Sequence, residues 1–257
     1  MHQRTRQLSW VVLGALLAIG LAAIVGRFLY PTNLGGVLDP VRTRILALAG
    51  ITDPLIAQRP ADVLSFDANF RNHRTITRLH LVAGAMFFLL LPFQLSARSR
   101  RGRRWHRVSG RVMLGAGAML AASALFFSVI TPWAGTMETL GVTLATLWFL
   151  FAGITAWRAI RRGDILHHRE WMLRAIAMPV GVVVIRLVGG VLDFYMLPLA
   201  LGPRTLFWIS VWVGLGLSAA VMEGWVRSTR VRPAQMGGLS SMFAPSRTSM
   251  QYPRARS

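Results

Sequence analysis

Two stretches rich in histidine and arginine carry the side chains best suited to chemistry. "RGRRWHRVSG" contains His106 and "LHHREWMLRA" contains His167 and His168, and an apolar run follows each stretch. If the two runs are neighbouring helices, His106 and His168 approach each other at a similar depth. They would then supply the two axial nitrogens of a haem b, and nearby arginines would suit its propionates. Alternatively, these histidines only mark helix ends at the lipid headgroups, where such residues commonly lie.

The rest of these stretches indicates a membrane interface and no catalytic centre. We expect five residues at the headgroup layer: Arg107, Arg111, Arg169, Trp171 and Arg174. A zinc site needs further ligands, and Glu170 alone is near, so we predict no metal site. The chain has no cysteine, which excludes thiolate metal sites and cysteine nucleophiles. It also lacks the G-x-S-x-G, H-E-x-x-H and Walker A motifs, so we identify no catalytic residue.

Polar residues inside the apolar runs form a second group of candidates. Arg186 lies about 22 Å along its run, and Asp193 follows two turns later on the same face. His80 and Gln94 share one face of an earlier run, near its outer and inner ends. Because membrane-embedded charges usually face the bundle interior, we expect an intramembrane polar cluster of His80, Gln94, Arg186 and Asp193. Glu138 is a further candidate, and a structural Arg186–Asp193 pair is the alternative to a ligand site.

Composition identifies the elements that must position these residues. Of the 257 residues 54% are hydrophobic and only 15% are charged, which favours an integral membrane protein. Six apolar segments approach or exceed the roughly 20 residues that cross a bilayer as a helix. They are 8–30, 79–97, 112–130, 139–157, 171–197 and 205–222. The sequence therefore predicts an all-α bundle of six transmembrane helices.

Arginine distribution predicts the orientation of the bundle. The formal net charge is +20, and every basic residue other than histidine is arginine. Loops 98–111 and 158–174 carry seven and five arginines, whereas the turns at 131–138 and 198–204 carry one between them. The positive-inside rule then places both termini in the cytoplasm, in an inner (cytoplasmic) membrane with anionic headgroups near the arginines. With the arginines beside apolar runs and no nucleic-acid-binding motif, we expect no nucleic-acid partner.

The same pattern divides the chain into four parts. Residues 1–30 form a first, uncleaved transmembrane helix, and 31–75 form an extracytoplasmic connection with room for one short surface helix. Residues 76–226 form a five-helix membrane core. Residues 227–257 are rich in Ser, Pro, Gly and Arg, which predicts a disordered basic cytoplasmic tail.

Several motifs in order resemble a known family. "FDANFRNHRTITRLH", "LLLPFQL", "HRVSGRVML", "LATLWFLFAGITAWRAIRRGDILHHREWMLRAIA" and "VIRLV" are similar to a bacterial multi-pass membrane family catalogued as domain of unknown function 2306. The resemblance covers about half the chain. The matching positions are His80, Gln94, His106, Arg107, Gly110, Arg111, Asp164, His168, Arg169, Trp171, Met172, Arg174 and Arg186. "LPFQL" and "LRAIA" depart from the Gly-Pro-Gln-like and Arg-Ser-Tyr-Ala-like stretches usual in the family.

The resemblance implies a membrane fold and no established activity. We therefore expect an uncharacterised multi-pass inner-membrane protein with an internal polar cluster. The alternatives are a haem-binding redox protein with bis-His ligation and, more weakly, a small-solute transporter, for which the paired broken helices are missing.

Overall fold

The protein is an all-α, multi-pass membrane protein. A computed structural model describes residues 3–29, 60–96, 103–195 and 201–229, with four isolated positions between 40 and 48. Every element in these ranges is helical. Six of the described helices are long and apolar enough to cross a membrane, as predicted. Many of their large apolar side chains, such as Leu89, Phe93 and Leu144, are exposed, as expected of a surface that acyl chains cover.

The helices follow one another with short connections in the second half of the chain. In order they are α1 (Gln3–Leu29), α4 (Pro60–Asn72), α5 (Arg74–Leu95), α7 (Arg103–Leu125), α8 (Thr136–Arg161), α9 (Ile165–Tyr195) and α10 (Pro203–Ser228). A π-helical turn, η1 (Phe126–Ile130), continues α7.

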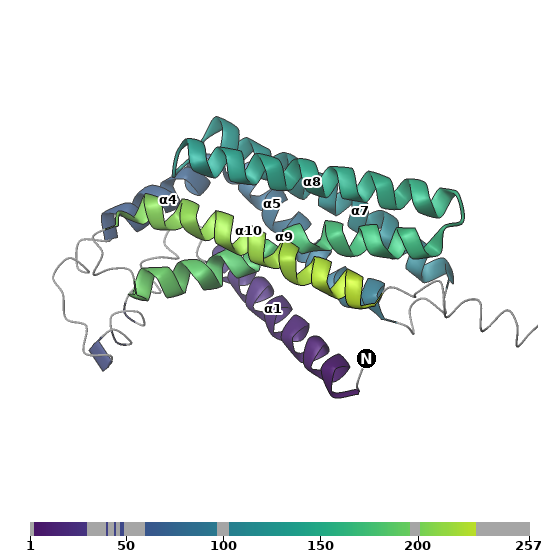
Figure 1. Ribbon diagram of the computed structural model, residues 1–257. Helices are drawn as coiled ribbons and strands as arrows, with labels where there is room; N and C mark the ends of the chain where they lie inside the picture. Colours follow the sequence, from purple (N-terminus) through teal and green to yellow (C-terminus); the bar gives the residue numbers. More distant parts are fainter. Residues whose placement is uncertain are drawn as a thin grey trace, which may run out of the picture.

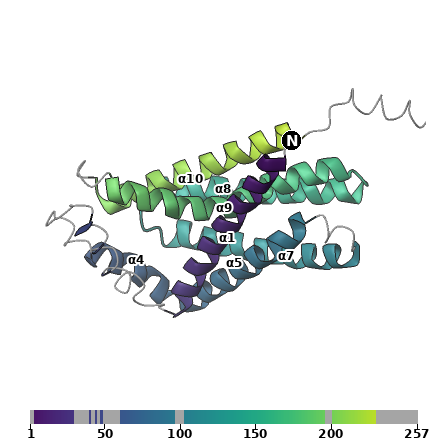
Figure 2. The ribbon, with the colours of Figure 1, turned by 90° about the horizontal axis from the view of Figure 1, so that it is seen from below.

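The spanning helices form two groups, which are joined by α1 and by the packing of α7 on α8. Helices α5 and α7 pack as one pair, and α9 packs between α8 and α10. Helix α1 contacts both α5 and α9, and Figure 2 shows it crossing the bundle obliquely. The α8–α9 turn and the end of α10 lie at one end of the bundle, and α4 lies at the other (Figure 1). We call these the inner and outer ends.

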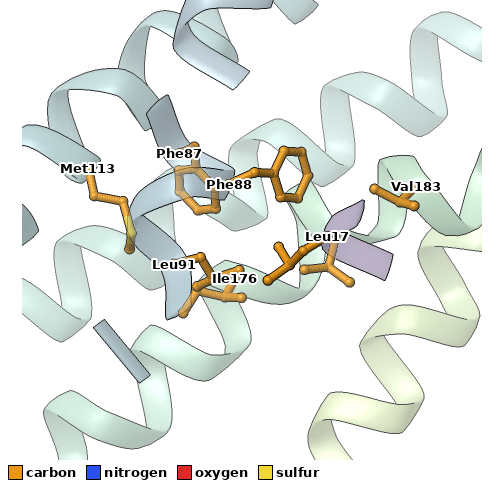
Figure 3. Close-up of a cluster of buried hydrophobic side chains, with 8 residues drawn as sticks. Leu17, Phe87, Phe88, Leu91, Met113, Ile176 and Val183 are labelled. Atoms are coloured by element: carbon orange, nitrogen blue, oxygen red, sulfur yellow. The ribbon is translucent and has the colours of Figure 1, made fainter. Parts of the chain in front are cut away.

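An apolar core holds the groups together where α1, α5, α7 and α9 meet. Its buried members come from all four helices, and Figure 3 shows them converging: Leu17, Phe87, Phe88, Leu91, Met113, Ile176, Val180 and Val183. A second cluster between α9 and α10 consists of Ala177, Met178, Val211 and Leu215. The face of α5 that the sequence predicts to point inward does so, because Gly84, Phe87 and Leu91 are all buried.

The helices extend beyond the apolar runs that predict them. At the inner end, α8 ends at Arg161, two residues before Gly163, whose φ of 79° suits glycine. Two backbone bonds, from Gly163 N to the Ile160 oxygen and from Asp164 N to the Ala159 oxygen, close a Schellman motif. The Asp164 carboxylate accepts a bond from the His167 backbone N–H at 2.9 Å and so caps α9. His106 and His168 consequently lie in the first turns of α7 and α9.

Some predicted features lie outside the described residues. These are the tail from residue 230 onward, most of the connection before α4, and the side chain of Asp193, whose backbone belongs to α9. Helix α4 is a short helix of the kind allowed for the connection, placed at its end.

Candidate functional site

His80 occupies the outer part of the α5–α7 interface. Its Nδ1 lies 2.9 Å from the Ser123 hydroxyl, and that hydroxyl donates to the Met119 carbonyl at 2.8 Å. The Ser123 hydroxyl thus connects the His80 ring to the backbone of α7. The opposite ring nitrogen, Nε2, is then directed away from Ser123.

Arg27 of α1 lies in the same region, and two aromatic rings connect it to His80 by successive contacts. Its side chain is only 7% exposed, and its guanidinium lies 5.0 Å from the ring centre of Phe70. Phe70 in turn lies 5.1 Å from Phe127, and Phe127 lies 6.1 Å from His80, measured between ring centres. Helices α1, α4, α5 and η1 therefore converge around one site.

Arg186 of α9 completes this group, which we call the outer cluster: Arg27, His80 and Arg186. Helix α1 packs on α9 one turn before Arg186, where a Cβ at Gly20 would lie 3.0 Å from Val183, and Arg186 lies close enough to Arg27 for electrostatic repulsion and close to His80. Its side chain is exposed, and it makes no hydrogen bond or ion pair with any residue that the structure describes. Of these three residues, His80 and Arg186 are candidates from the sequence, whereas Arg27 is not.

Gln94 lies on the same face of α5 as His80 but four turns away, at the inner end. Its side-chain amide donates to the Ser109 hydroxyl at 2.6 Å and to the His106 carbonyl at 3.2 Å. It therefore ties α5 to the start of α7 and takes no part in the outer cluster. Glu138 is likewise separate: it is buried and accepts the Ala134 backbone N–H at 2.6 Å, next to the first turn of its own helix.

The two histidines proposed as haem ligands lie in different local settings. His168 is half-buried, and its Nδ1 donates to the Ala156 carbonyl of α8 at 2.9 Å. His106 is half-buried on α7, which packs against α5 and α8, while α9 packs against α8, α10 and α1. Helices α7 and α9 face each other across an apolar cavity of about 260 Å³, lined by Met113 and Met172 among others. No group of three or more metal-binding side chains occurs in the described parts of the chain.

Among the residues expected at the headgroups, Arg174 has a different environment. Its guanidinium binds both carboxylate oxygens of Glu223 on α10, at 2.8 and 3.3 Å, and stacks 4.9 Å from the ring of Trp171. Glu170 lies 3.7 Å from Arg174, and Arg227 lies 3.0 Å from Glu223. This inner network joins α9 to α10.

The other predicted interfacial residues lie near the inner end of the bundle. Arg107, Arg111 and Arg169 are exposed, and Trp171 is half-buried. Arg169 donates to the Thr229 hydroxyl at 3.1 Å, beside the end of α10.

The helices and this site define an integral membrane protein with polar clusters at both ends of its bundle. Residues 77–226, more than half of the chain, match the family described as "Predicted membrane protein (DUF2306)", and the chain belongs to that family. The match begins within α5 and ends within α10, so it covers the five-helix core and leaves out α1. No curated protein and no solved structure matches the chain.

Proposed function

We propose that the protein binds an anionic ligand at the outer cluster. Arg186 carries the proposal, because it is a membrane-embedded arginine without an ion pair to any described residue. A charge within the membrane is costly unless a partner or water compensates it. Arg27 adds repulsion at this place, which an anion would relieve.

The shape of the arginine side chain also indicates which anions fit the outer cluster. Its planar guanidinium offers parallel N–H donors that match the oxygens of a carboxylate or a phosphate. Two arginines from different helices can hold two oxygens of one anionic group. Binding would thus link α1 to α9.

We further propose that the protein resides in the cytoplasmic membrane, with both termini and the inner end in the cytoplasm. The arginines at this end support the orientation: Arg104, Arg107, Arg111, Arg158, Arg161, Arg162, Arg169 and Arg227 are all exposed there. Cytoplasmic leaflets are rich in anionic lipids, which attract such residues by roughly 1 kcal/mol each. Anionic headgroups are therefore the proposed partners of the inner end.

Haem binding through His106 and His168 is the second candidate. One observation favours it: the bond from His168 Nδ1 to the Ala156 carbonyl would leave Nε2 as a lone-pair donor, as in many metal-bound histidines. The second ligand, His106 of α7, would have to coordinate the same iron from the other side of the apolar cavity.

Thermal unfolding of the detergent-purified protein tests anion binding. At constant ionic strength, inorganic phosphate should raise the Tm of the wild type saturably, because a ligand that binds only the folded state stabilises it. The gain is about 2.7 kcal/mol at 100 times the Kd. Arg186→Gln should lose this response, and the exposed inner-end variant Arg111→Gln should keep it. A phosphate response that is equal in all three proteins would refute the proposal, and so would a wild type that responds neither to inorganic phosphate nor to a lipid that carries a phosphate.

A further inference from the structure

We infer that the anion of the outer cluster is the phosphate of a membrane lipid that reaches Arg186 from the side of the bundle. This inference rests on the proposed function and names the ligand's chemical class. It depends on where the cluster opens, how deep it lies and what surrounds it.

The cluster opens toward a surface that acyl chains cover. Arg186 is exposed, and the exposed residues around it on α9 are apolar: Val182 is 44%, Leu187 41% and Val191 55% exposed. A soluble anion would have to leave water and cross this apolar surface, at high cost. A lipid phosphate does not have this cost, because it is attached to acyl chains that already lie against the apolar surface.

The depth of the cluster also fits a lipid headgroup. Arg186 lies about 22 Å along its apolar run, which is roughly 8 Å from the far side of a hydrocarbon core about 30 Å thick, and Arg27 lies two residues before Leu29. An arginine side chain at this depth reaches the interface by extending toward it. Substrate sites of secondary transporters, by contrast, typically lie near the bilayer midplane.

The chemistry of the cluster selects phosphate within a lipid headgroup. Arg186 presents a fork of donors that no described carboxylate occupies, and Arg27 is buried close by above the Phe70 ring. A phosphodiester offers two unsubstituted oxygens to such donors. The walls contributed by Phe70 and Phe127 are apolar and suit the glycerol and upper chain carbons better than a hydrated ion.

Native mass spectrometry of the detergent-solubilised full chain tests this inference. The probes are phosphatidylglycerol, diacylglycerol as the same lipid without phosphate, and soluble glycerol 3-phosphate. We expect the wild type and Arg111→Gln to retain phosphatidylglycerol, and Arg186→Gln to bind it roughly tenfold more weakly, about 1.4 kcal/mol. Arg186→Lys keeps the charge without the fork and should bind with intermediate affinity, which separates recognition from a folding defect.

The outcomes separate the inference from the proposed function. If inorganic phosphate stabilises the protein through Arg186 while phosphatidylglycerol binds wild type and Arg186→Gln equally, the site takes a soluble anion and the lipid inference is wrong. Equal retention of diacylglycerol and phosphatidylglycerol would contradict it too. If neither the soluble nor the lipid phosphate depends on Arg186, both the inference and the proposed function fail.

Discussion

Two arginines of α9 show how differently one residue type is accommodated in this protein. Arg174 is 12% exposed and is enclosed by Glu170, Glu223 and the Trp171 ring. Arg186 lies three turns further along the same helix, is exposed, and has no carboxylate partner among the described residues. The first arrangement is complete within the chain and is structural. The second has no partner among the described residues, which do not include the Asp193 side chain, and for it we propose a ligand.

Replacing Arg174 should destabilise the protein more than replacing an exposed arginine. In Arg174→Gln the Glu223 carboxylate, whose side chain is 33% exposed, loses a bidentate partner, at a cost of about 1 kcal/mol, whereas Arg111→Gln should change stability by about 0.5 kcal/mol or less. Denaturant titration of the purified variants measures both changes. The double variant with Glu223→Gln should lose less than the sum of the single variants, because the two residues share one interaction. Strict additivity would show that the pair contributes nothing.

Absorption spectroscopy decides between the two interpretations of the histidines. We expect no Soret band from the purified wild type, since His168 already bonds to α8 and His106 lies on a helix that does not pack closely against α9. His168→Ala should then cost about 1 kcal/mol, the value of its one hydrogen bond. Stoichiometric haem in the wild type, lost in both His106→Ala and His168→Ala but kept in His80→Ala, would establish the redox alternative instead.

The sequence predicts single residues well when the signal is local. A polar residue within an apolar run is conspicuous, so Arg186 and His80 are candidates from the sequence alone, and the helical period places His80 on the face of α5 that points inward. The helical period predicts which face of a helix a residue lies on, but not which residue of another helix it contacts. It therefore grouped Gln94 with His80, although Gln94 bonds to Ser109 of α7 at the inner end. Arg174 and Glu223 are 49 residues apart and border different apolar runs, so each was interpreted as a helix boundary and their pairing was not predicted.

At the scale of elements, helix ends depend on capping as well as hydropathy. The apolar runs predicted all six spans, but the helices continue until Gly163 or Asp164 offers a stop or a cap. Packing between helices is set by small residues that hydropathy does not reveal. At Gly214 of α10, a Cβ atom would lie 2.7 Å from the backbone nitrogen of Ile185, so α9 and α10 touch closely there.

The substitution Gly214→Ala should therefore separate α9 from α10. The added methyl group meets the α9 backbone, which cannot move aside as a flexible side chain can, and overpacking of this kind costs about 1–3 kcal/mol. Gly216→Ala on the same helix is the matched control, because its methyl group meets nothing within 4 Å. The control should be neutral or slightly stabilising through helix propensity. Equal Tm values for the two variants in detergent would contradict the close approach.

At the scale of the whole molecule, the bundle places its two polar clusters at opposite ends. The inner network links α9 to α10, and the outer cluster brings α1 against α5 and α9. Helix α1 lies outside the matched family region yet supplies Arg27, so the outer cluster is completed by a segment that the family region lacks. Hydropathy predicted the number of spans but not this crossing, because the position of α1 is determined by contacts distant in sequence.

The access of Arg186 to the outer leaflet depends on which end of the bundle faces the cytoplasm. The absence of cysteine allows a direct measurement, in which single cysteines are introduced at exposed turn positions and labelled with a membrane-impermeant maleimide in spheroplasts. Thr136→Cys should be labelled in intact spheroplasts, and Arg162→Cys only after the membrane is opened, because the arginine-rich turn is retained in the cytoplasm. Labelling of Arg162→Cys but not Thr136→Cys in intact spheroplasts would place Arg27, His80 and Arg186 in the cytoplasmic half, and labelling of both would contradict the six-helix topology.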